Sequence, residues 1–160
     1  MKRILTTIVL LSALATATFA QNGKAIYNKY SDRQEVSAVY ISPAVFKMMK
    51  KLPDINTTAG DINLTPMIES LTGFYLLSTQ HKATGSYIKA DVDKALKEGK
   101  YELLLEAKED RENVRIYTVS KDEIVTSLAI VTTDDSSVTF ICLDGKIPES
   151  ALEKLLQASL

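Results

Sequence analysis

The sequence offers few side chains that could serve as a nucleophile, a general base or a metal ligand. It contains one histidine, His81, and one cysteine, Cys142. A catalytic triad needs a base beside a nucleophile and a third group that orients the base. His81 lies in a polar stretch and no Gly-x-Ser-x-Gly elbow is present, so we interpret it as an exposed loop residue. Cys142 lies among Phe140, Ile141 and Leu143, which indicates a small buried hydrophobe; a reactive thiol or an intermolecular bridge is the alternative.

A metal site would have to consist mainly of carboxylates, because histidine and cysteine are so scarce. Outside Glu109-Asp110, we consider two close acidic pairs, Asp91 with Asp93 and Asp134 with Asp135. Neither pair has the glycine and closing glutamate of an EF-hand loop. We interpret the first pair as part of a helix's first turn and the second pair as turn formers, with calcium binding as the alternative. The sequence therefore predicts no metal site and no cofactor.

Other motifs with chemical meaning are weak. Thr84-Gly85-Ser86 precedes a predicted helix and could hold an anion, but three small residues are common in purely structural turns. Met48, Met49 and Met67 fall on predicted helix faces, where they serve either as core or as an adaptable partner-binding groove. Tryptophan, the commonest stacking platform for sugars, is absent. We predict no catalytic residues and expect that the protein is not an enzyme.

The first twenty residues have the pattern of a cleavable signal peptide. Lys2 and Arg3 precede an apolar run at residues 4–14, and Thr18-Phe19-Ala20 places small residues where signal peptidase cuts. The apolar run is shorter than the roughly 20 residues of a membrane span, although an N-terminal anchor is the alternative. No cysteine follows to accept a lipid. We predict cleavage after Ala20, export to the periplasm or beyond the cell, and no stable membrane anchor afterwards.

Composition sets the remaining limits. The chain is 46% apolar and 24% charged, which is typical of one globular domain, and we assign it to residues 21–160. A chain of this size buries enough surface to fold without disulfides. Cleavage would remove two of the 19 basic residues and none of the 20 acidic ones, leaving a net charge of about −3. This balance argues against nucleic acid as a partner, because phosphate binding relies on clustered lysine and arginine.

The first half of the mature chain is predicted to alternate between helices and strands. The expected elements are a helix at 24–32, a strand at 36–41, a helix from Pro43 to Pro53, a short helix from Pro66, a strand at 74–77 and a helix at 86–98. In the second of these helices Val45, Met48, Met49 and Leu52 have helical spacing and are expected to face inward. The pattern does not fix where the helix at 86–98 begins, because residues 84–90 could instead extend a strand.

From Tyr101 the pattern changes to the period of two that is typical of strands. Four strands at 101–108, 114–119, 123–133 and 138–143, joined by short turns, predict an antiparallel meander, and Pro148 opens a last helix. We therefore expect an α+β fold, a mainly antiparallel sheet with a C-terminal four-strand meander and helices packed on one face. The opposite face, expected to carry Arg115 and Tyr117, would be solvated or used for interaction.

Several segments together resemble a known family. They are VSAVYISPAVFKMM, GFYLLST, DVDKALKEGKYELLLEAKED, NVRIYTVSKDEIVTSLAIVTTDD and FICLDGKIPESALEKLL. The chain resembles the Bacteroides-type family of small exported proteins called domain of unknown function 4252. The resemblance implies export, and an envelope-signalling setting through genes near sigma-factor and anti-sigma-factor genes. The family has no assigned activity, so it implies no site residues.

The sequence thus favours a non-catalytic envelope protein that binds a protein partner. The alternative is a periplasmic carrier of a small apolar ligand or lipid, held between the helices and the sheet. A carrier would need an apolar pocket of several hundred Å³. An enzyme with an unrecognised site is the least favoured reading.

Overall fold

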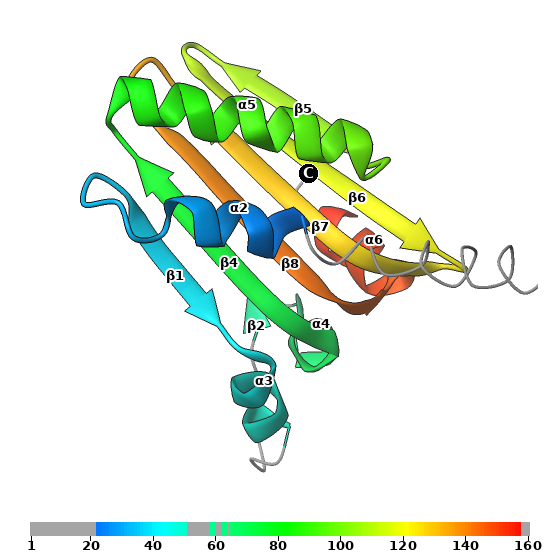
Figure 1. Cartoon of the computed structure of the whole chain (residues 1–160). Helices are drawn as coiled ribbons and strands as arrows, with labels where there is room; N and C mark the ends of the chain where they lie inside the picture. Colours follow the sequence, from blue (N-terminus) through cyan, green and yellow to red (C-terminus); the bar gives the residue numbers. More distant parts are fainter. Residues whose placement is uncertain (1–21, 51–57, 60–61, 64, 158–160) are drawn as a thin grey trace, which may run out of the picture.

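A computed structural model describes residues 22–50, 58–59, 62–63 and 65–157. The predicted signal peptide lies outside these residues. Six antiparallel strands form one sheet in the order β1-β4-β8-β7-β6-β5 (Figure 1). Their bounds are β1 (Ser37–Ile41), β4 (Leu71–Thr79), β5 (Glu102–Glu109), β6 (Glu112–Lys121), β7 (Ile124–Thr133) and β8 (Val138–Pro148). The α+β fold and the C-terminal meander β5 to β8 are confirmed. A separate hairpin joins β2 (Thr58–Ala59) to β3 (Ile62–Asn63).

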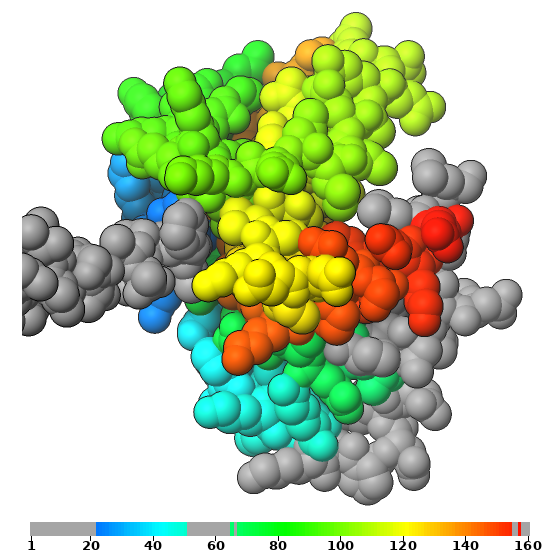
Figure 2. Space-filling view, turned by 90° about the vertical axis from the view of Figure 1, so that its right-hand side faces the viewer, coloured from blue at the N-terminus to red at the C-terminus, as the bar shows by residue number. Residues whose placement is uncertain are grey.

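Five described helices surround the sheet. They are α2 (Asn22–Tyr30), α3 (Pro43–Met49), α4 (Thr65–Ser70), α5 (Lys82–Glu98) and α6 (Glu149–Gln157). Helices α2 and α5 lie side by side across one face of the sheet, as expected (Figure 1). In Figure 2, α2 (blue) and α5 (green) lie to the left and α6 (red) lies to the right, on the opposite side of the sheet.

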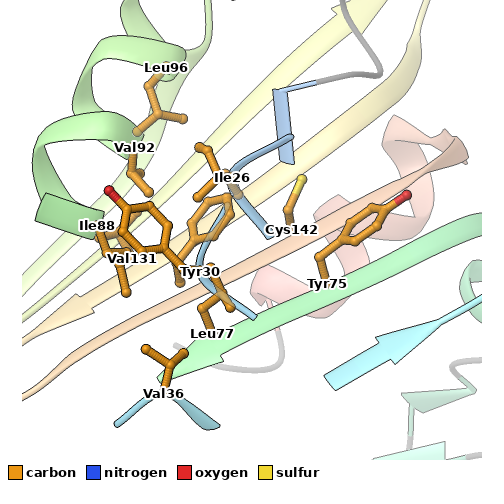
Figure 3. Packing of buried hydrophobic residues seen from close by; sticks show 12 residues of the cluster. Ile26, Tyr30, Val36, Tyr75, Leu77, Ile88, Val92, Leu96, Val131 and Cys142 are labelled. Atoms are coloured by element: carbon orange, nitrogen blue, oxygen red, sulfur yellow. The ribbon is translucent and has the colours of Figure 1, made fainter. Parts of the chain in front are cut away.

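The first hydrophobic core lies between the sheet and helices α2 and α5 (Figure 3). Ile88, Val92 and Leu96, spaced four residues apart, supply the buried face of α5, as predicted. Opposite them lie buried residues of α2 and of the central strands: Ile26, Tyr30, Leu77, Ala129, Val131, Phe140 and Cys142.

Helix α5 begins four residues earlier than its main prediction, and the strand alternative for 84–90 is wrong. Threonine, glycine and serine are poor helix formers, but tertiary contacts stabilise this turn. The Thr84 hydroxyl donates to Glu35 Oε1 at 2.8 Å. A Cβ on Gly85 would lie only 3.1 Å from a Val138 methyl, so the helix packs closely on β8 here.

A second hydrophobic core lies on the opposite face of the sheet. Neighbouring residues of a strand point to opposite faces, and here both sets are apolar. Leu128 and Leu143, directly paired on β7 and β8, face this second core, whereas their neighbours Ala129 and Cys142 face the first. Tyr117, expected on the solvated face, instead packs against the first core, so that expectation is wrong. The second core also contains Phe46, Leu71, Val125, Ile147 and Leu152.

The inward face of α3 also differs from the prediction. Phe46 is buried and Met49 packs against the second core, whereas Val45 and Met48 are exposed. Leu52 lies outside the described residues. With five apolar residues besides Pro43 in a seven-residue helix, two overlapping faces are available, and the larger Phe46 side chain takes the buried position.

Strand β8 runs through Asp144-Gly145, a pair expected to break it. The register between β4 and β8 shifts between Leu71 and Gly73, and Gly145 pairs with Leu71. A Cβ at Gly145 would lie 2.6 Å from the Ser70 carbonyl oxygen. The glycine therefore permits a bulge and a close backbone approach rather than a turn.

Gly23 marks the closest approach of α2 to the sheet. A Cβ at this position would lie 2.8 Å from Cys142 Cβ and closer still to its sulfur. Because Gly23 is buried against Cys142 of the first core, the absence of a side chain at Gly23 sets the distance between α2 and β8.

We expect Gly23→Ala to lower the free energy of unfolding by about 1–3 kcal/mol, because α2 must move away from β8. This cost exceeds the gain of roughly 1 kcal/mol that alanine brings to a helix. Urea denaturation measures the change, with Lys24→Ala at the exposed neighbouring position as control. An equally stable or more stable Gly23→Ala protein would contradict this packing.

Candidate interaction surface on β1 and α3

His81 is exposed and lies just before α5, as predicted. Its Nδ1 lies 2.9 Å from the Thr84 hydroxyl oxygen. That hydroxyl donates to Glu35, in the segment that leads into β1. The network therefore ties the start of α5 to the start of β1, which is a structural role.

The candidate calcium pairs are satisfied by protein groups. Asp91 Oδ2 accepts from Lys29 Nζ at 2.5 Å and from the Tyr30 hydroxyl at 2.6 Å. These hydrogen bonds, the one from Lys29 foremost, lower the pKa of Asp91. Asp93 pairs with Lys89 at 2.6 Å. Both aspartates lie in the middle of α5 rather than in its first turn, because the helix begins earlier than expected.

Asp134 stabilises the turn between β7 and β8, as predicted. Its carboxylate accepts from the backbone and the hydroxyl of Ser136 and Ser137, which holds its pKa well below the usual range. This turn and the start of α5 line a hollow of about 360 Å³ that includes Gly85 and Ser86. Its lining contains Lys82 and Lys89 as well as Asp134 and Asp135, so the positive and negative charges balance and do not favour an anion. Within the described residues, no group of three or more His, Cys, Asp or Glu could hold a metal ion.

A buried polar cluster beneath α5 was not predicted from the sequence. Ser127 Oγ donates to Asp144 Oδ1 at 3.0 Å and lies 2.7 Å from the Tyr101 hydroxyl oxygen. A hydroxyl has a single proton, so Tyr101 donates to Ser127. Cys142 Sγ lies 3.5 Å from Ser127 Oγ. The available signal was the presence of Ser127 and Asp144 within otherwise apolar strands.

The cluster combines a thiol, a phenol and a carboxyl group, and burial raises the pKa of all three. Cys142 is completely buried, as predicted, and burial raises the pKa of its thiol to about 12. Burial likewise raises the pKa of Asp144 and of Tyr101. The thiolate, not the thiol, is the nucleophile. The cluster therefore joins β7 and β8 to the connection between α5 and β5. It exposes no reactive atom.

Seven large apolar side chains of the described residues are exposed: three lie on α5 and β5 (Tyr87, Leu103 and Leu104), and four lie on the consecutive elements β1 and α3. Val39 and Tyr40 on β1 are 45% and 42% exposed, and Val45 and Met48 on the adjacent α3 are 37% and 59% exposed. We call these four residues the β1–α3 surface. Val39 and Tyr40 point to opposite faces of the sheet and flank the same edge. Single exposed hydrophobics are ordinary on a protein, whereas several around one edge favour an interaction site.

Tyr40 is held in place by two other tyrosines. Its ring stacks on that of Tyr75 with centroids 5.3 Å apart and lies 5.9 Å from that of Tyr27. Such aromatic pairs add roughly 0.5–1.5 kcal/mol each. The exposed ring is therefore positioned before any partner binds, which lowers the entropy cost of binding.

The two edge strands of the sheet differ in chemistry. Strand β5 carries four charged residues among eight and has a register shift between Leu103 and Leu105. Its Glu106 binds Arg115 at 2.7 Å and Lys108 at 3.3 Å. Charges and bulges are the usual protection of a strand edge against pairing. Strand β1 has neither: its five residues are uncharged and pair with β4 without a shift.

Together these features define a small α+β domain with one protected and one unprotected sheet edge. The chain belongs to the family described as a domain of unknown function (DUF4252), whose model matches residues 30–155. This match confirms the resemblance noted from the sequence. No curated protein and no solved structure matches the chain. No helix within the described residues is long and apolar enough to cross a membrane.

The raised pKa of the buried Asp144 carboxyl group predicts that the stability of the protein depends on pH. The pKa of Asp144 in the folded protein is raised above its ordinary value of 3.8, so the folded protein holds this proton more tightly than the unfolded chain does. The stabilisation that results is complete below pH 3.8 and is lost as the pH rises through the folded pKa. Asp144→Asn removes this titration and keeps an acceptor for Ser127. We expect the variant to gain stability relative to the wild type as the pH rises above about 4, and the gain to level off above the folded pKa.

Urea denaturation over a pH series measures this difference. Asp134→Asn is the matched control with the opposite sign. The pKa of Asp134 is lowered, so that variant should lose stability relative to the wild type as the pH rises through the acid range. A difference between Asp144→Asn and wild type that does not change with pH would contradict the burial of an ionisable group at this site.

Proposed function

We propose that the protein is exported, is cleaved after Ala20, and acts without catalysis by binding another protein of the cell envelope through the β1–α3 surface. The observation that carries this proposal is the exposure of four apolar side chains, two on the uncharged edge strand β1 and two on the helix α3 that follows it. Interfaces of this kind are built around apolar and aromatic anchors, among which tyrosine and methionine are enriched. The signalling setting implied by the family's gene neighbourhoods suits a protein that acts by contact.

The cavity between the helices and the sheet is too small for the carrier alternative. The hollow between α2, α5 and the sheet, lined by Ile26, Val92 and Phe140 among others, has a volume of about 10 Å³. That volume holds one water molecule at most, whereas a bound lipid needs several hundred Å³. Two larger hollows among the described residues, of about 630 and 360 Å³, are formed mainly by polar and charged residues, many of them in turns.

The proposal is tested in the cell that naturally makes the protein. The full chain is expressed with a photo-crosslinking amino acid in place of Met48 on the β1–α3 surface. The matched control carries it in place of Tyr87, which is 61% exposed on α5 and lies outside the surface. We expect several-fold more protein adducts at position 48 than at position 87, and a purified chain whose mass begins at Gln21.

Three outcomes would overturn parts of the proposal. A chain that retains Met1 would contradict export with cleavage. Equal adducts at the two positions would contradict the choice of surface. Adducts to lipid rather than protein would favour the carrier alternative.

A further inference from the structure

We propose that β1 pairs with β1 of a second copy of this chain, in a two-fold symmetric dimer whose sheet runs continuously through both copies. The inference rests on the proposed function, because it names the partner of the β1–α3 surface. It is carried by the chemistry of the two sheet edges, by the symmetry of antiparallel pairing and by the charges at the ends of β1.

The outer edge of β1 is available for pairing. Strand β1 lies at the end of the sheet, and no described element lies on its outer side (Figure 1). An edge strand presents unpaired backbone N–H and C=O groups, which makes it a template for another strand. Because β1 has no charge, proline or bulge, nothing in its sequence opposes such pairing.

Symmetry selects a register for the pair. A two-fold axis perpendicular to the sheet relates antiparallel strands, and the same patch then serves both copies. With all five residues paired, the axis passes beside Val39, so that Val39 faces its own copy and Tyr40 faces Ala38. Val39 and Tyr40 point to opposite faces of the sheet. Both exposed side chains of β1 thus gain an apolar cross-strand neighbour.

Charges at the ends of β1 favour the antiparallel arrangement. The segment that enters β1 carries exposed Asp32, Arg33 and Glu35, with a net charge of −1. The helix that follows β1 carries exposed Lys47, and its C-cap is the exposed Lys50. Antiparallel pairing places the acidic end of one copy beside the basic α3 of the other. Parallel pairing would bring ends of like charge together.

Head-to-tail pairing of β1 with β5 of another copy is disfavoured. Such a contact does not close on itself and would generate a filament. The charges and the register shift of β5 oppose it. The isologous β1 pair uses only the unprotected edge and leaves the protected edge in solvent.

The test measures the mass of the purified, naturally processed protein by light scattering or sedimentation over about 1–500 μM, the range suited to a small interface. We expect the mass of a dimer at the upper end. Val39→Lys places two like charges opposite each other and should weaken the dimer about a hundredfold. Leu103→Lys on β5, 52% exposed in the wild type, is the matched control and should leave the dimer unchanged.

A mixing experiment tests the register. If Val39 faces its own copy, Val39→Lys and Val39→Glu proteins should each be monomers, and a mixture of the two should recover a heterodimer. Recovery also shows that the variants are folded, which their circular dichroism and thermal unfolding check separately. Dimers of both separate variants, or a mixture that stays monomeric, would overturn the proposed register.

The outcome distinguishes this inference from the proposed function. A wild-type protein that stays monomeric at every concentration overturns the dimer. If position 48 nevertheless gives protein adducts that position 87 does not, the proposed function stands and the edge serves a different protein. Monomers without such adducts overturn both.

Discussion

An open β-sheet leaves two rows of backbone hydrogen-bonding groups without strand partners, and this constraint organises the whole molecule. The groups must be hydrated, protected or paired. In this protein the β5 edge is protected by Glu102, Glu106 and Lys108 and by a register shift. The β1 edge is uncharged and regular. Such a difference within one sheet is expected when one edge must avoid other strands and the other must accept one.

The rest of the fold keeps β1 in a conformation that can accept a strand. Both faces of the central strands are buried, so the sheet is a rigid base for its edge. Thr79 and Thr84 donate to Glu35, which fixes the chain where it enters β1. Stacking on Tyr75 holds Tyr40 on the strand itself. A strand that is already extended loses little conformational entropy when it pairs.

Sequence patterns predicted the elements better than their packing. Alternation from Tyr101 onward was sufficient for the meander, because turns separate four strong strand patterns. The choice between Val45 and Phe46 as the inward residue of α3 depends on a second core that involves distant strands, so local spacing could not decide it. The early start of α5 depends on Glu35 in the same way. Asp144-Gly145 has the composition of a turn, and only contact with Ser70 and Leu71 shows that the strand continues.

The candidate surface was only partly visible in the sequence. The strand at 36–41 and the methionines of α3 were identified, with a partner-binding groove as one interpretation. That β1 is an edge strand could not be predicted, because strand order depends on the pairing of β4 with β8 across a long stretch of chain. The buried contact between Tyr101, Ser127 and Asp144 was missed for the same reason: its members meet only after β5, β7 and β8 have paired.

The central claim is that this protein binds a second copy of itself through the edge strand β1. The backbone amides of β1 test this claim most directly. Hydrogen–deuterium exchange of the wild-type protein at low and high concentration follows β1, with β5 as an internal reference within each sample. We predict that the amides of β1 exchange more slowly at high than at low protein concentration, and that those of β5 exchange at the same rate at both. Equal exchange of β1 at both concentrations, or protection that develops in β5 instead, would contradict it.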